Sequence, residues 1–160
     1  NHSIRKKDRE NSSCLTTNIS SQAKKTTSYS KPITHEQYFS DYIPDSVLDT
    51  TILSFQKYPL PTKRFKQLKH GHITKEGKLD LHGYRSDEAK EKLLDYLDHA
   101  RQQGKRCILI IHGKGSYGGE PPRIKNLVNV WLPQITEVIA FHSAVPKDGG
   151  TGAVYVLLKR

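Results

Sequence analysis

Leu79-Asp80-Leu81-His82-Gly83 is a short apolar run that ends in a polar residue and a glycine, as at the exit of a buried strand. A second such run, Ile110-Ile111-His112-Gly113-Lys114-Gly115, follows about thirty residues later. The residues between them have the spacing of one amphipathic helix. Two strands joined by a helix are expected to be parallel neighbours. Both histidines should then emerge at the same end of one sheet, where open α/β sheets usually bind ligands.

The C-terminal half of the chain predicts an α/β fold, a two-layer sandwich in the order β-α-β-α-β-β. Right-handed crossovers make the first three strands parallel, and the final turn predicts an antiparallel last strand. The result is a four-stranded mixed sheet with helices packed against it. Strands are expected at 79–81, 107–111, 138–141 and 153–158, with helices starting at the N-cap Ser86 and at Pro121-Pro122, and a turn at 148–152.

The first half of the chain has weaker patterns. Residues 1–31 are rich in Ser, Thr, Asn and Lys and predict a disordered basic tail. Residues 32–76 predict an N-terminal extension that packs on the main domain, residues 77–160, or on a partner. Within this extension, Asp45-Ser46 predicts the cap of a short helix over 47–55. The basic stretch that follows, from residue 61, predicts either a short helix or a loop into the first strand.

The formal net charge of +10 indicates a polyanionic partner, nucleic acid first and an anionic membrane surface second. No uninterrupted apolar stretch approaches the roughly 18 residues of a membrane span. The two cysteines, Cys14 and Cys107, make no disulfide scaffold, so a reducing cytoplasm is expected.

Asp80, His82 and His112 are the candidates for catalysis. A carboxylate beside a histidine can orient its ring and raise its basicity. On RNA, one histidine would take the proton of the ribose 2′-hydroxyl and the other would protonate the departing 5′-oxygen. For either histidine alone, a satisfied polar residue at a strand end is the simpler interpretation, but the pair beside a carboxylate favours a function.

A second set of residues is expected to bind the nucleic acid. Backbone N–H groups of the glycine loop, together with a lysine, can stabilise charge that develops on a phosphoryl group. A direct role and a plain surface position remain equally open for His142 and Lys147. The predicted contacts are Arg85, Gly113, Lys114, Gly115, His142, Lys147, Gly149 and Gly150.

Rival chemistries have less support. The loop from Gly113 to Gly118 matches G-x-G-x-x-G, but Pro121-Pro122 starts the next helix too late for a dinucleotide site. A two-metal nuclease needs several carboxylates, and Asp80 is the only acidic residue in the two strand-end motifs. No zinc-binding spacing is present either. No cofactor is therefore expected to be required, and a loosely bound Mg²⁺ stays open.

Three motifs of this sequence resemble those of the Smr (small MutS-related) domain. They occur in the family's order, with matching elements between them over residues 77–160. The segment from about 65 to 77 also resembles stand-alone bacterial Smr proteins with an N-terminal extension. The motifs are Leu79-Asp80-Leu81-His82-Gly83, His112-Gly113-Lys114-Gly115 and Gly149-Gly150-Thr151-Gly152-Ala153.

The resemblance implies a fold like the C-terminal domain of translation initiation factor three, and endonuclease activity on RNA or DNA. Asp80 and His82 match the family's aspartate-leucine-histidine motif. In some members the target is mRNA on stalled or collided ribosomes, and the extension docks on the ribosome. We therefore expect a metal-independent endonuclease that acts on RNA. The alternatives are a DNA-nicking enzyme of repair or recombination and a noncatalytic nucleic-acid- or ribosome-binding module.

Overall fold

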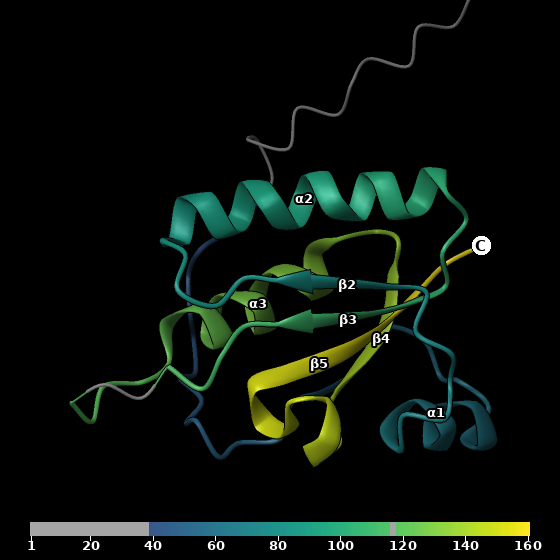
Figure 1. The fold of residues 1–160 in the computed structure, drawn as a ribbon, viewed down its shortest axis with the longest axis horizontal. Coiled ribbons are helices and arrows are strands. Elements are labelled where there is room, and N and C mark those ends of the chain that lie inside the picture. The colour runs from purple at the N-terminus through teal and green to yellow at the C-terminus, as the bar shows by residue number, and fades with distance from the viewer. Residues whose placement is uncertain (1–38, 116–117) are drawn as a thin grey trace, which may run out of the picture. The chain divides into compact units, whose positions relative to one another are not determined.

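The chain folds around one five-stranded sheet in the order β1-β4-β5-β3-β2 (Figure 1). The computed structural model describes residues 39–115 and 118–160, so the predicted basic tail, residues 1–31, lies outside the described residues. The strands are β1 Ser54–Gln56, β2 Gly77–Asp80, β3 Cys107–Ile111, β4 Val138–Ser143 and β5 Ala153–Leu158, and the α-helices are α1 Thr62–Lys69, α2 Ser86–Gln102 and α3 Arg123–Gln134. Two short 3-10 turns, η2 Pro146–Asp148 and η3 Gly150–Gly152, lead into β5.

Strands β2 and β3 are parallel neighbours joined by α2, as the sequence predicted. Strand β5 lies between β3 and β4 and is antiparallel to both. Strands β2, β3 and β4 therefore run in one direction, and the predicted mixed α/β sheet is confirmed. The sheet has five strands rather than four, because β1 pairs antiparallel with β4 and adds an edge that the sequence pattern did not reveal.

Helix α2 buries one stripe of side chains formed by Ala89, Leu93, Leu97 and Ala100. This spacing of three and four residues places all four on one face of the helix. Ser86 is the first residue of the helix rather than its cap, so the predicted start was one residue late.

No helix within residues 39–115 and 118–160 has the length and apolarity needed to cross a membrane.

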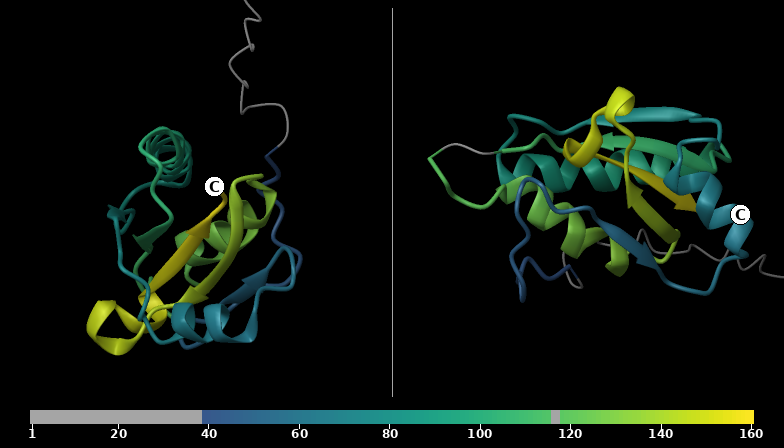
Figure 2. Two further views of the ribbon diagram at one scale, coloured as in Figure 1. Left: turned by 90° about the vertical axis from the view of Figure 1, so that its right-hand side faces the viewer. Right: turned by 90° about the horizontal axis from the view of Figure 1, so that it is seen from below.

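The two faces of the sheet are covered differently, with α2 and α1 on opposite sides (Figure 2). On one face, α2 and α3 pack on the inward residues of β3, Ile108 and Ile110. On the other face, α1 packs through Leu68 against the cluster that contains Leu109 and Tyr155. Helix α1 contacts β4 and β5, which leaves β2 and part of β3 open on this face.

The predicted helix over 47–55 is wrong, because this segment is irregular, has a turn at Asp49-Thr50 and ends in β1. Long-range contacts hold it in this form. Asn126 of α3 accepts a hydrogen bond from the backbone N–H of Val47 at 2.7 Å and donates to its carbonyl at 3.0 Å. The fully buried ammonium of Lys125 donates to the carbonyls of Asp49 at 2.8 Å and Thr51 at 2.5 Å. These polar contacts replace the helical bonds that local sequence favours.

Candidate active site

The end of β2 carries an aspartate and a histidine that are bonded to each other. Asp80 is the last residue of β2, and its Oδ1 lies 2.5 Å from Nδ1 of His82. The backbone N–H of His82 donates to the same oxygen at 3.0 Å. Gly83 follows with φ of 77°, a conformation that side-chain-bearing residues rarely adopt. The strand end and the turn together hold the imidazole against the carboxylate.

This pair favours one tautomer of His82. Partial burial raises the pKa of Asp80, but hydrogen bonds from the ring and backbone of His82 outweigh it and keep that pKa below its usual value. The carboxylate can only accept, so Nδ1 of His82 donates and Nε2 carries the free lone pair. The His82 side chain is 69% exposed. The structure therefore offers a proton-accepting nitrogen to a molecule that approaches from solvent.

The other two sequence motifs meet at this point. The carbonyl of Gly152 accepts hydrogen bonds from the backbone N–H groups of His112 and Gly113, both at 3.0 Å. Gly113 lies against His82, since a Cβ added to it would sit 3.4 Å from the Cβ of His82. Its φ of 79° also favours glycine. The glycine loop after β3 is thus fixed between His82 and the turn before β5.

His112 does not share the exposed rim with His82, which corrects the prediction of a second histidine acting as an acid there. Its side chain is buried, with 3% of the residue exposed. Its Nδ1 lies 2.8 Å from the carbonyl of Gly113 and donates to it. Burial lowers the pKa of His112 from 6.5 to about 4, and the charge of Lys125 acts in the same direction. The ring is therefore neutral near pH 7, where it holds the loop.

The glycine loop offers fewer donors than the sequence suggested. The N–H of Gly113 is used by the carbonyl of Gly152 and is not available to a phosphate. Lys114 and Gly115 are exposed, and their N–H groups bond to no other backbone group of the described residues. Gly115 packs closely on Pro122, since an added Cβ would lie 2.9 Å from that ring. Among the described residues of this loop, Lys114, Gly115 and Gly118 are exposed to solvent.

His142 is buried in β4, which β5 and β3 separate from β2 and the Asp80–His82 pair, so the predicted surface position is wrong and no exposed contact is found there. Its ring packs edge-on against Phe65 of α1 with the centroids 6.0 Å apart. Its Nδ1 lies 2.8 Å from the carbonyl of Ser143. Burial lowers the pKa of His142, and the charges of Lys69 and His70 add to this effect. Its surroundings indicate a structural role beneath α1.

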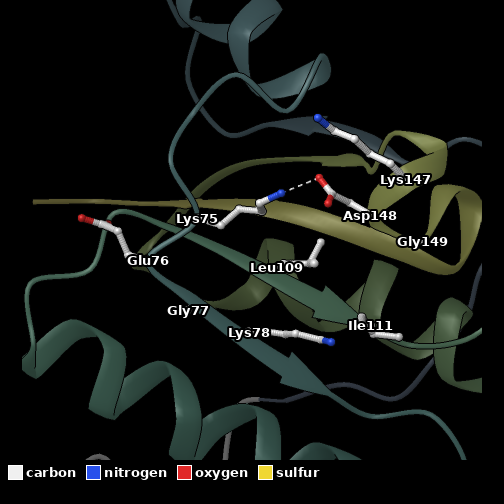
Figure 3. Close-up of a pocket in the computed structure, with 9 residues that line it drawn as sticks. All are labelled: Lys75, Glu76, Gly77, Lys78, Leu109, Ile111, Lys147, Asp148 and Gly149. Atoms are coloured by element: carbon white, nitrogen blue, oxygen red, sulfur yellow. Dashed lines mark hydrogen bonds and ion pairs between the residues drawn. The ribbon is translucent and has the colours of Figure 1, made fainter.

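The remaining predicted contacts are at the surface. Lys147 and Gly149 line an open groove of about 650 Å³ over β2 and β3 (Figure 3). Gly150 follows with φ of 57° at the start of the turn into β5. Arg85 is exposed directly before α2, three residues after His82. The structure therefore brings Lys147 and Gly149 to the face of the sheet beside β2 and places Arg85 on the chain that leaves the site.

Two contributions to this region were missed. Lys125 is fully buried near His112, although its spacing of three and seven residues from the apolar Val128 and Leu132 of α3 could have indicated an inward position. The second is Asp148, which binds Lys75 at 2.6 Å and accepts a short hydrogen bond from Tyr155. This network ties the Lys147 turn to the sheet. In the sequence, the position of Asp148 before two glycines was the only indication of this network.

Metal ligands are not concentrated at this site. Among the described residues, no group of three or more His, Cys, Asp and Glu side chains is placed to hold a metal ion. Asp80 and His82 are the two polar side chains at the end of β2, and they bind each other.

A family model of the Smr domain matches residues 79–159, a stretch that includes all three motifs described above. This chain belongs to the Smr domain family. It is 30% identical over 141 residues to the ribosome rescue factor SmrB of Aliivibrio salmonicida (strain LFI1238), covering 88% of this chain and 77% of the relative. The SmrB of Vibrio cholerae serotype O1 (strain M66-2) is 31% identical over 121 residues, which are 76% of this chain and 62% of that protein.

A solved Smr structure has a similar fold. YdaL, a stand-alone small MutS-related protein from Escherichia coli, superposes with a TM-score of 0.67 at 27% sequence identity. The match covers 79% of this chain and 96% of YdaL. The 141-residue match to SmrB is longer than the Smr domain itself. Similarity therefore extends into the residues before the Smr domain, where β1 and α1 lie.

The buried, neutral state of His112 predicts a pH dependence of stability. Its folded pKa of about 4 lies below the unfolded value of 6.5, so the unfolded chain binds the extra proton as the pH falls between them. The stabilisation is complete above pH 6.5 and is lost toward pH 4. The shift corresponds to about 3 kcal/mol.

His112→Asn is the matched variant, because it keeps a donor near the position of Nδ1 but cannot titrate. Urea unfolding at pH 7 and at pH 4 should show a wild-type loss that exceeds the loss of the variant by about 3 kcal/mol. Equal losses in the two proteins would contradict the buried neutral assignment.

Proposed function

We propose that this Smr protein is an endonuclease that cuts RNA, with the Asp80–His82 pair as its proton-transfer centre. The single observation that supports this role is an exposed imidazole whose Nδ1 is bonded to a carboxylate at 2.5 Å. Such a partner fixes the tautomer and stabilises the imidazolium that forms when Nε2 takes a proton.

The proposed reaction begins when Nε2 of His82 takes the proton of a ribose 2′-hydroxyl. The 2′-oxygen attacks the adjacent phosphorus, and the bond from phosphorus to the 5′-oxygen breaks. The proton then passes from His82 to this oxygen, directly or through water, so His82 returns to its neutral state. The products are a 2′,3′-cyclic phosphate and a 5′-hydroxyl. This sequence needs one exposed histidine, and His112 acts as a positioning residue for the glycine loop.

The exposed Lys114 is proposed to stabilise the charge on the phosphoryl oxygens. It follows Gly113, which contacts His82, and its stem lies against Gly152, where an added Cβ would be 3.2 Å from its Cγ. The backbone that carries Lys114 therefore lies next to the residue that contacts His82. The attraction between the positive charge of Lys114 and a phosphate bound beside His82 strengthens as negative charge develops on the phosphoryl oxygens.

Ribosome-bound mRNA is the proposed substrate. The relatives named ribosome rescue factor SmrB match this chain over the Smr domain and beyond it. The net charge of +10 suits a surface made largely of RNA. A metal-independent reaction is proposed, because Asp80 and His82 supply proton transfer without one.

Helix α1 is the proposed contact to ribosomal RNA. Its apolar residues, Phe65 and Leu68, face the sheet, while the lysines Lys63 and Lys66 are exposed. With His70 and His72, these lysines line a surface hollow of about 340 Å³. From residue 57 to residue 75 the chain carries no acidic side chain. A one-signed surface of this kind suits a phosphate backbone.

Substitutions at the pair test the proposed reaction. Asp80→Ala and His82→Ala should each lower the cleavage rate of mRNA on stalled ribosomes about 10²- to 10⁴-fold, the usual contribution of a general base. His112→Asn should retain most of the activity, because it keeps a donor for the carbonyl of Gly113. Cleavage is measured from the rate of appearance of mRNA fragments, and circular dichroism checks the fold.

The control is His99→Gln, since His99 is also an exposed histidine and lies on α2. It should cleave at the wild-type rate. Unchanged cleavage by the Asp80 and His82 variants would contradict the site, and loss of wild-type cleavage in EDTA would contradict the metal-independent reaction. Absence of any wild-type cleavage would favour a binding module instead.

A charge change on α1 tests the ribosome contact. The double variant Lys63→Gln/Lys66→Gln should bind ribosomes with about tenfold lower affinity than the wild type at 0.1 M salt. Less of it should therefore pellet with ribosomes. Its control, Lys92→Gln/Arg101→Gln, removes the same charge from exposed positions of α2. If both variants pellet equally, α1 is not a specific contact.

A further inference from the structure

The face of the sheet that α1 leaves uncovered forms an open groove of about 650 Å³. Its floor is made by the side chains of Leu109 and Ile111 from β3. Lys78 of β2 lies along one side, and the Lys147–Gly149 turn lies along the other, as Figure 3 shows. The groove therefore presents to solvent an apolar floor between two sides that carry lysines.

The two acidic residues of the lining are already engaged. Asp148 binds the ammonium of Lys75 at 2.6 Å and also accepts a hydrogen bond from Tyr155. Glu76 accepts hydrogen bonds from the backbone N–H groups of Arg106 and Cys107, and it points away from the floor in Figure 3. The ion pair neutralises Lys75, and the hydrogen bonds hold the Glu76 carboxylate, which keeps its charge, at the edge of the groove away from its floor.

Lys78 and Lys147 are the two cationic side chains that lie beside the floor of the groove. Both are exposed, and neither forms an ion pair with another of the described residues. They belong to different elements, β2 and the η2 turn, on either side of the floor. Each side of the groove therefore carries a lysine that is not held in an ion pair by the described residues.

The groove leads to the Asp80–His82 pair. Side chains two residues apart in a strand point to the same face, so Lys78 and Asp80 lie on the same face of β2. From Gly77 to Asp80 the strand advances on the order of 10 Å, and the turn that carries His82 follows. This length takes a few nucleotides of an extended strand.

We propose that this groove binds the single-stranded RNA next to the scissile phosphate, with its bases on Leu109 and Ile111 and its phosphates at Lys78 and Lys147. The inference rests on the proposed nuclease function and adds the strand-binding subsite to it. A single strand exposes its bases to an apolar floor, whereas a duplex keeps them stacked inside. The paired cationic sides suit a backbone with one charge per nucleotide.

Binding without cleavage tests the subsite. The full chain with Asp80→Ala is titrated with a short fluorescent single-stranded RNA over a series of salt concentrations. Adding Lys78→Gln/Lys147→Gln should lower the affinity about 10- to 30-fold at 0.1 M salt and flatten the slope of log K against log salt by about 1.4, for two contacts. The control is Lys92→Gln/Arg101→Gln on α2, which removes equal charge and should leave the slope unchanged.

The groove and control double variants are also made in the chain that keeps Asp80, so that the subsite and the nuclease function are tested separately. The groove variant should raise KM and keep kcat. If RNA is cleaved and the groove and control variants behave alike, the subsite is overturned and the nuclease stands. If RNA is not cleaved but only the groove variant loses binding, the subsite stands and the nuclease is overturned. Duplex RNA that binds as tightly as the single strand would overturn the single-strand assignment.

Discussion

The parallel pairing of β2 with β3 is the constraint on which the site depends. The register runs from Gly77 opposite Ile108 to Asp80 opposite Ile111, and the N–H of Leu81 continues it to the carbonyl of Ile111 at 2.7 Å. Both strands therefore end at the same level. Because the side-chain period of a strand is two, a slip of one residue would turn Asp80 into the core and bring Leu79 to the surface.

The same pairing places two histidines that look alike in the sequence in different surroundings. His82 stands on the open face of the sheet with Asp80, while His112 points toward α3 and is buried near Lys125. The buried ring supports the loop through the carbonyl of Gly113, and the loop in turn packs on His82. An exposed ring is suited to accept a proton, whereas a buried neutral ring is suited to hold backbone in place.

Much of this arrangement follows from the sequence, because strand and helix periods are local properties. The order of the main elements, the parallel strands and the meeting of the first two motifs were all predictable. The burial of His112 was predictable in principle, since it continues the inward positions of Ile108 and Ile110. The irregular segment before β1 was not, because Asn126 and Lys125, which hold it, lie more than seventy residues away in the sequence. The groove required the same long-range information, since its sides come from β2 and the turn before β5.

The central claim is that His82 takes the proton of a ribose 2′-hydroxyl, and the ends of the cleaved RNA test it most directly. Fragments from mRNA cleaved by the purified wild-type protein on stalled ribosomes would be examined by mass spectrometry. The account predicts a 2′,3′-cyclic phosphate on one fragment and a 5′-hydroxyl on the other, with no cleavage where a 2′-deoxynucleotide replaces the scissile residue. A 5′-phosphate with a 3′-hydroxyl, or undiminished cleavage at the deoxynucleotide, would contradict it.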